Sequence, residues 1–272
     1  IVETEVTPRN FGRIAAQNAK QVVVQRIREA ERGMVFEKFS SRENDIVTGI
    51  IQRMENKNVY IDLGKAEAIL TPNEQIPGEI YRYHDRMKTD IVEVKKTSKG
   101  PQIMVSRTHP GLLKRLFELE VPEIHDGLVE IKSVAREPGM RSKISVYTKD
   151  ENIDPVGACV GHKGMRVQTI VNELRGEKID IVKYSSEPDQ YVANALSPAK
   201  VVSTEVLEEE KICRVIVPDY QLSLAIGKEG QNARLAAKLT GWKIDIKSES
   251  QAAEEAEQGA QEVGVAYEAD ED

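Results

Sequence analysis

The chain has 272 residues, enough for two or more domains, and its formal net charge of −7 would disfavour nucleic-acid binding if it were spread evenly. Residues 249–272 hold nine of the 45 acidic residues and no Lys or Arg, which leaves a net charge of +2 on residues 1–248. No apolar run reaches the ~18 residues of a membrane helix, and no secretory signal is visible. These features argue against a membrane protein and predict a cytoplasmic one with a slightly basic body and an acidic, disordered tail.

Nothing in the sequence indicates a metal, cofactor or catalytic site. Cys159 and Cys213 have no metal-ligand spacing and are typical of small buried residues in a reducing compartment. The four histidines share no ligand spacing with each other or with the cysteines, and no nucleophile–base arrangement is discernible. We therefore expect no cofactor, no metal and no enzymatic activity.

Residues 1–42 are expected to form mainly one long helix. Thr7 suits a helix cap, Pro8 suits the first turn, and apolar residues then recur at steps of three and four. Gly33 is expected to end or bend this helix. Nothing in the segment suggests chemistry, so it is interpreted as a packed connector.

Residues 43–109 change to the alternating pattern of β-strands. We expect five short strands, at 46–51, 59–63, 66–70, 91–94 and 103–106. Five strands in so short a segment fit a small closed barrel of the OB type, which binds oligonucleotides on one face. Tyr60 projects opposite to Val59 and Ile61, so it is a candidate stacking platform with Arg53 close in sequence; alternatively, Tyr60 only covers the barrel surface.

Two copies of one cassette follow, offset by 65 to 66 residues. Each copy has an apolar helix, a Gly-x-x-Gly loop at 161–164 or 227–230, a second helix, and a Gly-x-Lys-Ile-Asp-Ile strand starting at Gly176 or Gly241. In both copies a helix and two alternating strands come first, which is the order of a type II KH domain. The predicted fold class is therefore α+β multidomain: a long helix, an OB-fold barrel, and two tandem type II KH domains at 110–185 and 186–248, with the tail at 249–272.

The glycine loop suits contact with a nucleic-acid backbone. A Cβ at either glycine would obstruct a phosphate approaching the main-chain N–H groups, and the next helix offers a positive dipole end. Basic side chains lie at the loop tips and on the following helices. The predicted RNA-binding residues of the two cassettes are Gly161, His162, Lys163, Gly164, Arg166, Gly227, Lys228, Glu229, Gly230, Arg234 and Lys238.

Two of these positions leave alternatives open. Glu229 stands where a neutral or basic residue would suit RNA better, so the second loop is expected to grip less tightly or to leave the contact to helix and groove. His162 is either a pH-sensitive contact or a solvated loop histidine.

Several segments carry a family resemblance, and the order of barrel, KH and KH is itself specific. These segments are 7–17, 100–102, 106–110, 154–161, 171–174, 177–181, 196–199 and 225–234. Through them the chain resembles the NusA family of bacterial transcription elongation and termination factors, over roughly residues 1–248.

The resemblance implies a protein that binds nascent single-stranded RNA, RNA polymerase and other antitermination factors, and that modulates pausing, termination and antitermination. It also implies that most of the family's N-terminal polymerase-binding domain is missing, that residues 1–42 are the helical remnant of that domain, and that the acidic helical repeats of some members are absent. His162 stands where many members have Pro. We expect a monomer. The alternatives are the RNA-binding part of an RNA-processing enzyme and a KH-based protein-interaction scaffold.

Overall fold

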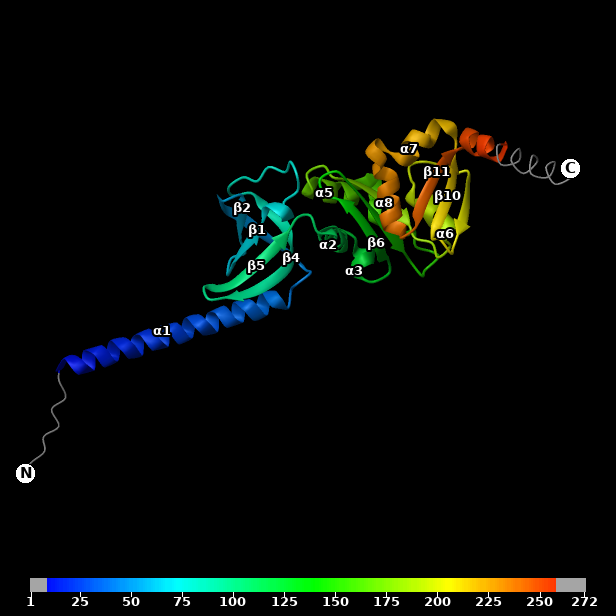
Figure 1. Ribbon diagram of the computed structural model, residues 1–272. Coiled ribbons are helices and arrows are strands. Elements are labelled where there is room, and N and C mark those ends of the chain that lie inside the picture. Colours follow the sequence, from blue (N-terminus) through cyan, green and yellow to red (C-terminus); the bar gives the residue numbers. More distant parts are fainter. Residues whose placement is uncertain (1–8, 258–272) are drawn as a thin grey trace, which may run out of the picture. The chain divides into compact units, whose positions relative to one another are not determined.

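The computed structural model describes residues 9–257, which fall into two compact units (Figure 1). The barrel unit comprises the chain up to Gln75 together with Ile80–Arg107. The KH unit comprises Ile76–Glu79 and the chain from Thr108 on. The predicted cap at Thr7 and Pro8 lies outside the described residues.

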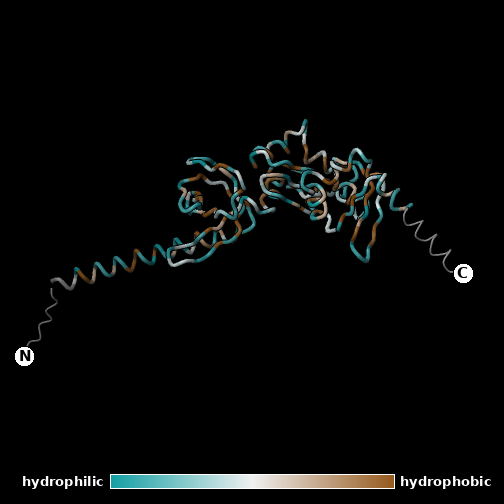
Figure 2. The backbone as a smooth tube through the Cα atoms, turned by 45° about the horizontal axis from the view of Figure 1, so that its top comes forward, coloured by the Kyte–Doolittle hydropathy of each residue, from teal (hydrophilic) through white to brown (hydrophobic). Residues whose placement is uncertain are grey.

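Helix α1 spans Arg9–Ser40 and continues through Gly33, so the expectation that Gly33 ends the helix is wrong. A helical glycine costs only about 1 kcal/mol, and the turns after Gly33 are anchored because Phe39 is buried and Val35 and Phe36 pack against the barrel core. Further from the barrel the helix keeps exposed apolar side chains such as Val22, and hydrophobic stretches recur along it (Figure 2).

The barrel is closed, with strand order β1-β2-β3-β5-β4. Its neighbouring strands are antiparallel except β3 and β5, which run parallel. Inward side chains such as Ile51, Ile61 and Ile91 are fully buried. The strands are β1 (Ile46–Glu55), β2 (Asn58–Asp62), β3 (Glu67–Leu70), β4 (Arg86–Thr97) and β5 (Gly100–Ser106), with the short helix η1 (Pro72–Glu74) after β3.

The KH unit contains two domains with the same topology, which confirms the predicted order of elements. In each domain the first two strands of a three-stranded sheet are antiparallel, and the third is parallel to the middle one. The first domain has α2 (Pro110–Glu120), α3 (Pro122–His125), β6 (Glu130–Glu137), β7 (Arg141–Tyr147), α4 (Pro155–Val160), η2 (His162–Gly164), α5 (Met165–Glu173) and β8 (Lys178–Lys183). The second has α6 (Pro188–Ala195), β9 (Ser203–Leu207), β10 (Ile212–Val217), η3 (Asp219–Gln221), α7 (Leu222–Ile226), η4 (Lys228–Gly230), α8 (Gln231–Thr240) and β11 (Lys243–Ser248).

The two KH domains share one apolar core. Ala135 and Val182 of the first domain belong to the same buried cluster as Val192 and Leu235 of the second. Helix α8 packs against β6 and β7, beside which it lies in Figure 1. The Tyr191 hydroxyl lies 2.8 Å from Ser145 Oγ, across the junction. Burial of this kind fixes the two domains against each other.

Residues 249–257 are helical, unlike the disordered tail expected from composition. The Ser250 amide donates to Asp219 at 3.1 Å, and Lys247 pairs with Glu255 at 2.5 Å, which ties the start of the tail to the second KH domain. The rest of the tail lies outside the described residues. Among the helices within 9–257, none combines the length and hydropathy needed to cross a membrane.

Candidate nucleic-acid interface

The two glycine loops have nearly the same backbone. Gly161 and Gly227 have φ/ψ of 75°/174° and 78°/170°, and Gly164 and Gly230 have 76°/13° and 73°/14°. In each loop the amide N–H of the second glycine donates a hydrogen bond to the carbonyl of the first, Gly164 to Gly161 and Gly230 to Gly227, both at 3.1 Å. Two sequences that differ at both inner positions therefore fold into one loop geometry.

Each first glycine is required by space as well as by conformation. A Cβ on Gly161 would lie 2.6 Å from the Arg166 side chain, and one on Gly227 would lie 2.8 Å from the Asn232 backbone nitrogen. A Cβ on Gly164 or Gly230 would meet nothing within 4 Å, so these two are required by their positive φ alone. The space beside the second glycine is thus open to a ligand atom.

The helices after the loops begin without a side-chain cap. Neither Gly164, before α5, nor Gly230, before α8, has a side chain to satisfy the first N–H groups. The positive end of each helix dipole favours an anion beside the loop. The arrangement can hold a phosphate next to each loop.

The inner loop residues are exposed, but they differ in charge. Lys163 and Glu229 occupy the same left-handed position, with φ of 51° and 54°. His162 corresponds to Lys228. The first loop therefore presents a lysine where the second presents a glutamate, and the basic residue of the second loop lies one position earlier.

Arg166 and Arg234 are engaged within the protein. Arg166 donates to the Ala158 carbonyl at 2.6 Å and pairs with Glu123 at 2.8 Å. Arg234 pairs with Glu137 of the first KH domain at 2.6 Å. This pairing, chiefly the hydrogen bond from Arg234, holds the pKa of Glu137 below its ordinary value.

Lys238 is exposed on α8, four residues after Arg234. The position in the second cassette that corresponds to Arg166 is Asn232, which is buried. Its amide donates to the carbonyls of Leu196 and Ala225 at 3.1 and 2.9 Å. Asn232 was not predicted from the sequence, although aligning the two cassettes would have marked the position.

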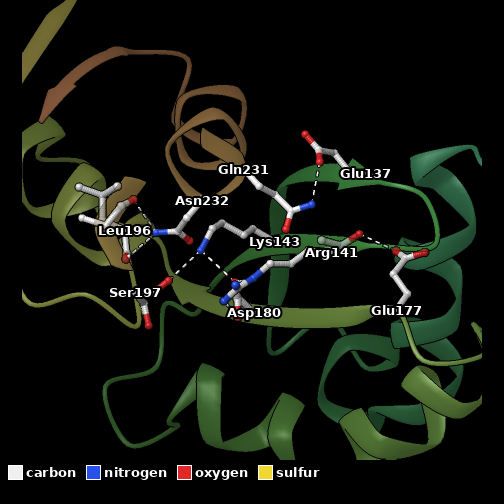
Figure 3. A network of polar contacts seen from close by, with 11 residues as sticks. Glu137, Arg141, Lys143, Glu177, Asp180, Leu196, Ser197, Gln231 and Asn232 are labelled. Carbon is white, nitrogen blue, oxygen red and sulfur yellow. Dashed lines mark hydrogen bonds and ion pairs between the residues drawn. The ribbon is translucent and has the colours of Figure 1, made fainter. Parts of the chain in front are cut away.

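A polar network in the first domain lies next to the junction with the second (Figure 3). The buried Lys143 Nζ donates to Asp180 at 2.9 Å and to the Ser197 carbonyl of the second domain at 2.8 Å. Arg141 also pairs with Asp180, at 2.7 Å. Burial would raise the pKa of Asp180, but the Arg141 hydrogen bond and the Lys143 charge outweigh it, so the pKa lies below its ordinary value.

The aspartate of the first Gly-x-Lys-Ile-Asp-Ile strand therefore serves structure. Lys143 itself has a pKa lowered by burial, which Asp180 partly offsets. These long-range partners have no local sequence signal.

In the barrel unit the structure brings Tyr60 and Arg53 together. The Arg53 guanidinium carbon lies 3.9 Å from the centroid of the Tyr60 ring, and the guanidinium pairs with Glu67 at 2.8 Å and Glu55 at 2.9 Å. Arg53 therefore covers one face of the half-exposed ring, and only the other face is available to a base.

Models of known protein families match each part of the chain. A model of the NusA-like first KH domain matches residues 107–184, and a model of the NusA-like second KH domain matches 188–254. The S1 RNA binding domain matches 40–106, and the NusA N-terminal domain matches 1–33.

Curated relatives match almost the whole chain. A transcription termination/antitermination protein NusA of Halalkalibacterium halodurans is 71% identical over 254 residues, which are 93% of this chain and 66% of that protein. The protein of the same name from Bacillus subtilis is 70% identical, covering 93% of this chain and 68% of that protein. That of Mycobacterium tuberculosis is 51% identical, covering 92% and 75%. The chain thus spans about two thirds to three quarters of the length of these relatives.

Proposed function

Because the chain belongs to the NusA family of transcription termination/antitermination proteins and carries RNA-binding domain types, we propose that it binds one strand of nascent RNA through both glycine loops. The observation that carries this proposal is the repeated loop geometry within a unit whose two domains share a core. Two phosphate-binding turns fixed on one body can engage one chain without a cost for ordering the domains.

The roles of the individual residues differ. Gly161, Gly164, Gly227 and Gly230 let the RNA backbone approach, while Lys163 and Lys228 supply exposed positive charge. Arg166 and Arg234 act first as supports of the loops, because both are paired with carboxylates. Lys238 and the open face of Tyr60 are further contact candidates.

The family resemblance supports further partners. We propose that the intact factor acts in the bacterial cytoplasm on RNA polymerase with other antitermination factors, without catalysis of its own, and modulates pausing and termination. The relatives are named transcription termination/antitermination proteins, which supports this part of the proposal. A direct measurement is the change in pause lifetime when the chain is added to a transcribing polymerase; an unchanged lifetime would contradict it.

Charge reversal at the loops tests RNA binding. The double variant Lys163→Asp with Lys228→Asp should weaken binding of single-stranded RNA in a gel-shift titration while the fold survives, because both side chains are exposed. The control is Lys211→Asp, since Lys211 is also exposed. Its carbonyl accepts a hydrogen bond from the amide of Lys243, which follows the end of α8 that is away from the glycine loop. Equal affinities of the double variant and the control would overturn the proposal.

Salt dependence gives an independent check. If about five phosphates are contacted, log K should fall against log salt with a slope near −3.5. A flat response would remove the electrostatic basis of the proposal. Cleavage of labelled RNA by the chain would instead favour an RNA-processing role, and absence of RNA binding would favour a protein-interaction scaffold.

A further inference from the structure

A groove lies within the barrel unit, between helix α1 and the strands. Helix α1 contributes Arg28 and Arg32, β2 contributes Tyr60, the β2–β3 loop contributes Lys65, and the β4–β5 turn contributes Lys99. The sequence pattern indicated only a packing role for α1, so this groove was not predicted.

The groove is basic. Arg28, Arg32, Arg53, Lys65 and Lys99 line it against only two carboxylates, Glu31 and Glu67. Arg53 is neutralised by its pairs with Glu55 and Glu67. Within the part of the chain that the structure describes, no ion pair involves the side chains of Arg28, Lys65 or Lys99, and all three are exposed. Their positive charge is available to an anionic ligand.

The wall formed by α1 is held in place. Phe39 is buried in the barrel core, and Lys96 Nζ lies 4.4 Å from the centroid of the Phe36 ring. Arg32 Nη1 donates to the Ser98 carbonyl at 3.3 Å, which ties the helix to the β4–β5 turn without compensating the charge. The cations on the helix and on the barrel are therefore prearranged around one space.

The lining indicates the class of ligand. The groove encloses about 660 Å³, which is within the range of small-molecule pockets, but such pockets are lined mainly by apolar and aromatic side chains. Here separate cations accompany a single aromatic ring. Proteins that bind single-stranded nucleic acids have this combination, because the cations contact the backbone and the ring stacks on a base. An acidic peptide would use the cations but would leave the open face of Tyr60 without a specific role.

We propose that this groove binds the backbone of a single RNA strand, with Arg28 and Arg32 contacting phosphates while a base stacks on the open face of Tyr60. The inference rests on the proposed RNA binding and extends it to helix α1, which thereby becomes one wall of an RNA site.

The test uses the full chain and a labelled, unstructured RNA of about 16 nucleotides, the upper site size of one OB fold. The variants are Arg28→Glu with Arg32→Glu, and Arg28→Glu alone, since the Arg28 side chain makes no hydrogen bond or ion pair within residues 9–257 that the variant would break. The matched control is Arg26→Glu on the same helix: Arg26 does not line the groove, and its side chain is 80% exposed. Circular dichroism verifies that each variant folds.

The expected result follows from counterion release, at about 0.7 in salt slope per phosphate contact. The double variant should lose about 1.4 in slope and bind about 25-fold more weakly at about 0.1 M salt, with the difference closing toward about 1 M. Arg28→Glu alone should show about half of that slope change and lose about fivefold. Arg26→Glu should bind like the wild type.

Three outcomes overturn the inference. In the first, Arg28→Glu binds RNA like Arg26→Glu while Lys163→Asp with Lys228→Asp is impaired. The glycine loops then bind RNA, and the groove is a site for an acidic protein instead. If the double groove variant loses affinity only because α1 unfolds, the single variant will bind normally. If the wild-type chain does not bind this RNA, the proposed function fails and the groove inference fails with it.

Discussion

The glycine loops of the two KH domains have the same backbone conformation, but different side chains stabilise the two domains. In the first domain the position after Gly176 is Glu177, fully buried and joined to Arg136 by bonds of 2.8 and 2.9 Å. In the second domain the corresponding residue is Trp242, which packs against the apolar core. Asp180 of the first domain is held by Arg141 and Lys143, whereas its counterpart Asp245 lies 3.6 Å from Lys247.

The comparison separates what the function requires from what each domain uses to fold. The paired positive-φ glycines set the loop in both copies. The side chains that support the loop can be an arginine with a carboxylate or a buried asparagine. A shared motif therefore fixes geometry without fixing affinity, because the charge next to the phosphate site is set by Lys163 in one loop and Glu229 in the other.

The largest expected effect is on the buried pair of the first domain. Arg136→Met leaves the buried Glu177 with neutral hydrogen-bond donors, Gly139 and Ser142, but without its charged partner. The free energy of unfolding should fall by about 3–5 kcal/mol in urea titrations. Arg214→Met in the second domain removes an exposed pair, 52% and 64% exposed, and should cost less than about 1 kcal/mol. Equal costs would show that the two domains do not differ in this way.

Alanine substitutions in the loops should cost different amounts. Gly227→Ala places a Cβ 2.8 Å from the Asn232 backbone nitrogen, and Gly161→Ala places one 2.6 Å from Cγ of Arg166, whose guanidinium is already held by hydrogen bonds. Both substitutions should therefore cost about 2–3 kcal/mol, whereas Gly164→Ala, strained only by its φ, should cost about 1 kcal/mol. Thermal unfolding measures the order, and a reversed order would contradict the loop geometry.

Exchanging the loop charges should make the two domains more alike. Glu229→Lys removes repulsion and should strengthen RNA binding about fivefold at about 0.1 M salt, while Lys163→Glu should weaken it by at least the same factor. Fluorescence anisotropy with one RNA measures both. If Glu229→Lys leaves the affinity unchanged, the second loop does not lie on the RNA.

Acid should weaken the first domain through its carboxylates. Burial would raise the pKa of Glu177, but the hydrogen bond and charge of Arg136 outweigh it, so the folded pKa is lowered. A lowered folded pKa contributes stability that is present above the unfolded value of about 4.3 and is lost as the pH falls through the folded value.

Unfolding free energies between about pH 7 and pH 3 measure this loss. The paired variant Arg136→Met with Glu177→Leu should lose less stability over that interval. Parallel curves for the wild type and the paired variant would show that the Arg136–Glu177 pair is not the source of this acid sensitivity.

Local patterns predicted the architecture. Alternating residues marked the barrel strands, and the repeated glycine loops with their closing strands marked both KH domains. The same logic failed at Gly33, because the packing of Phe36 and Phe39 beyond it stabilises the helix more than one glycine weakens it. The glycines and exposed lysines of the site follow directly from the motif.

The supports of the site depend on contacts between distant parts of the chain. Arg234 meets Glu137 across 97 positions, and Lys143 meets Ser197 across 54. The groove beside α1 likewise arises from three separate segments that only the closed barrel brings together. A single sequence carries no periodicity that reports such pairs, so Arg166 and Arg234 were predicted as RNA contacts without their internal partners.

Photo-crosslinking of a 4-thiouridine-labelled single-stranded RNA, mapped by mass spectrometry, tests most directly whether both loops hold one strand. We expect crosslinked residues at or beside both 161–164 and 227–230, from RNA molecules long enough to reach both loops. Crosslinks confined to one loop, or to neither, would contradict it.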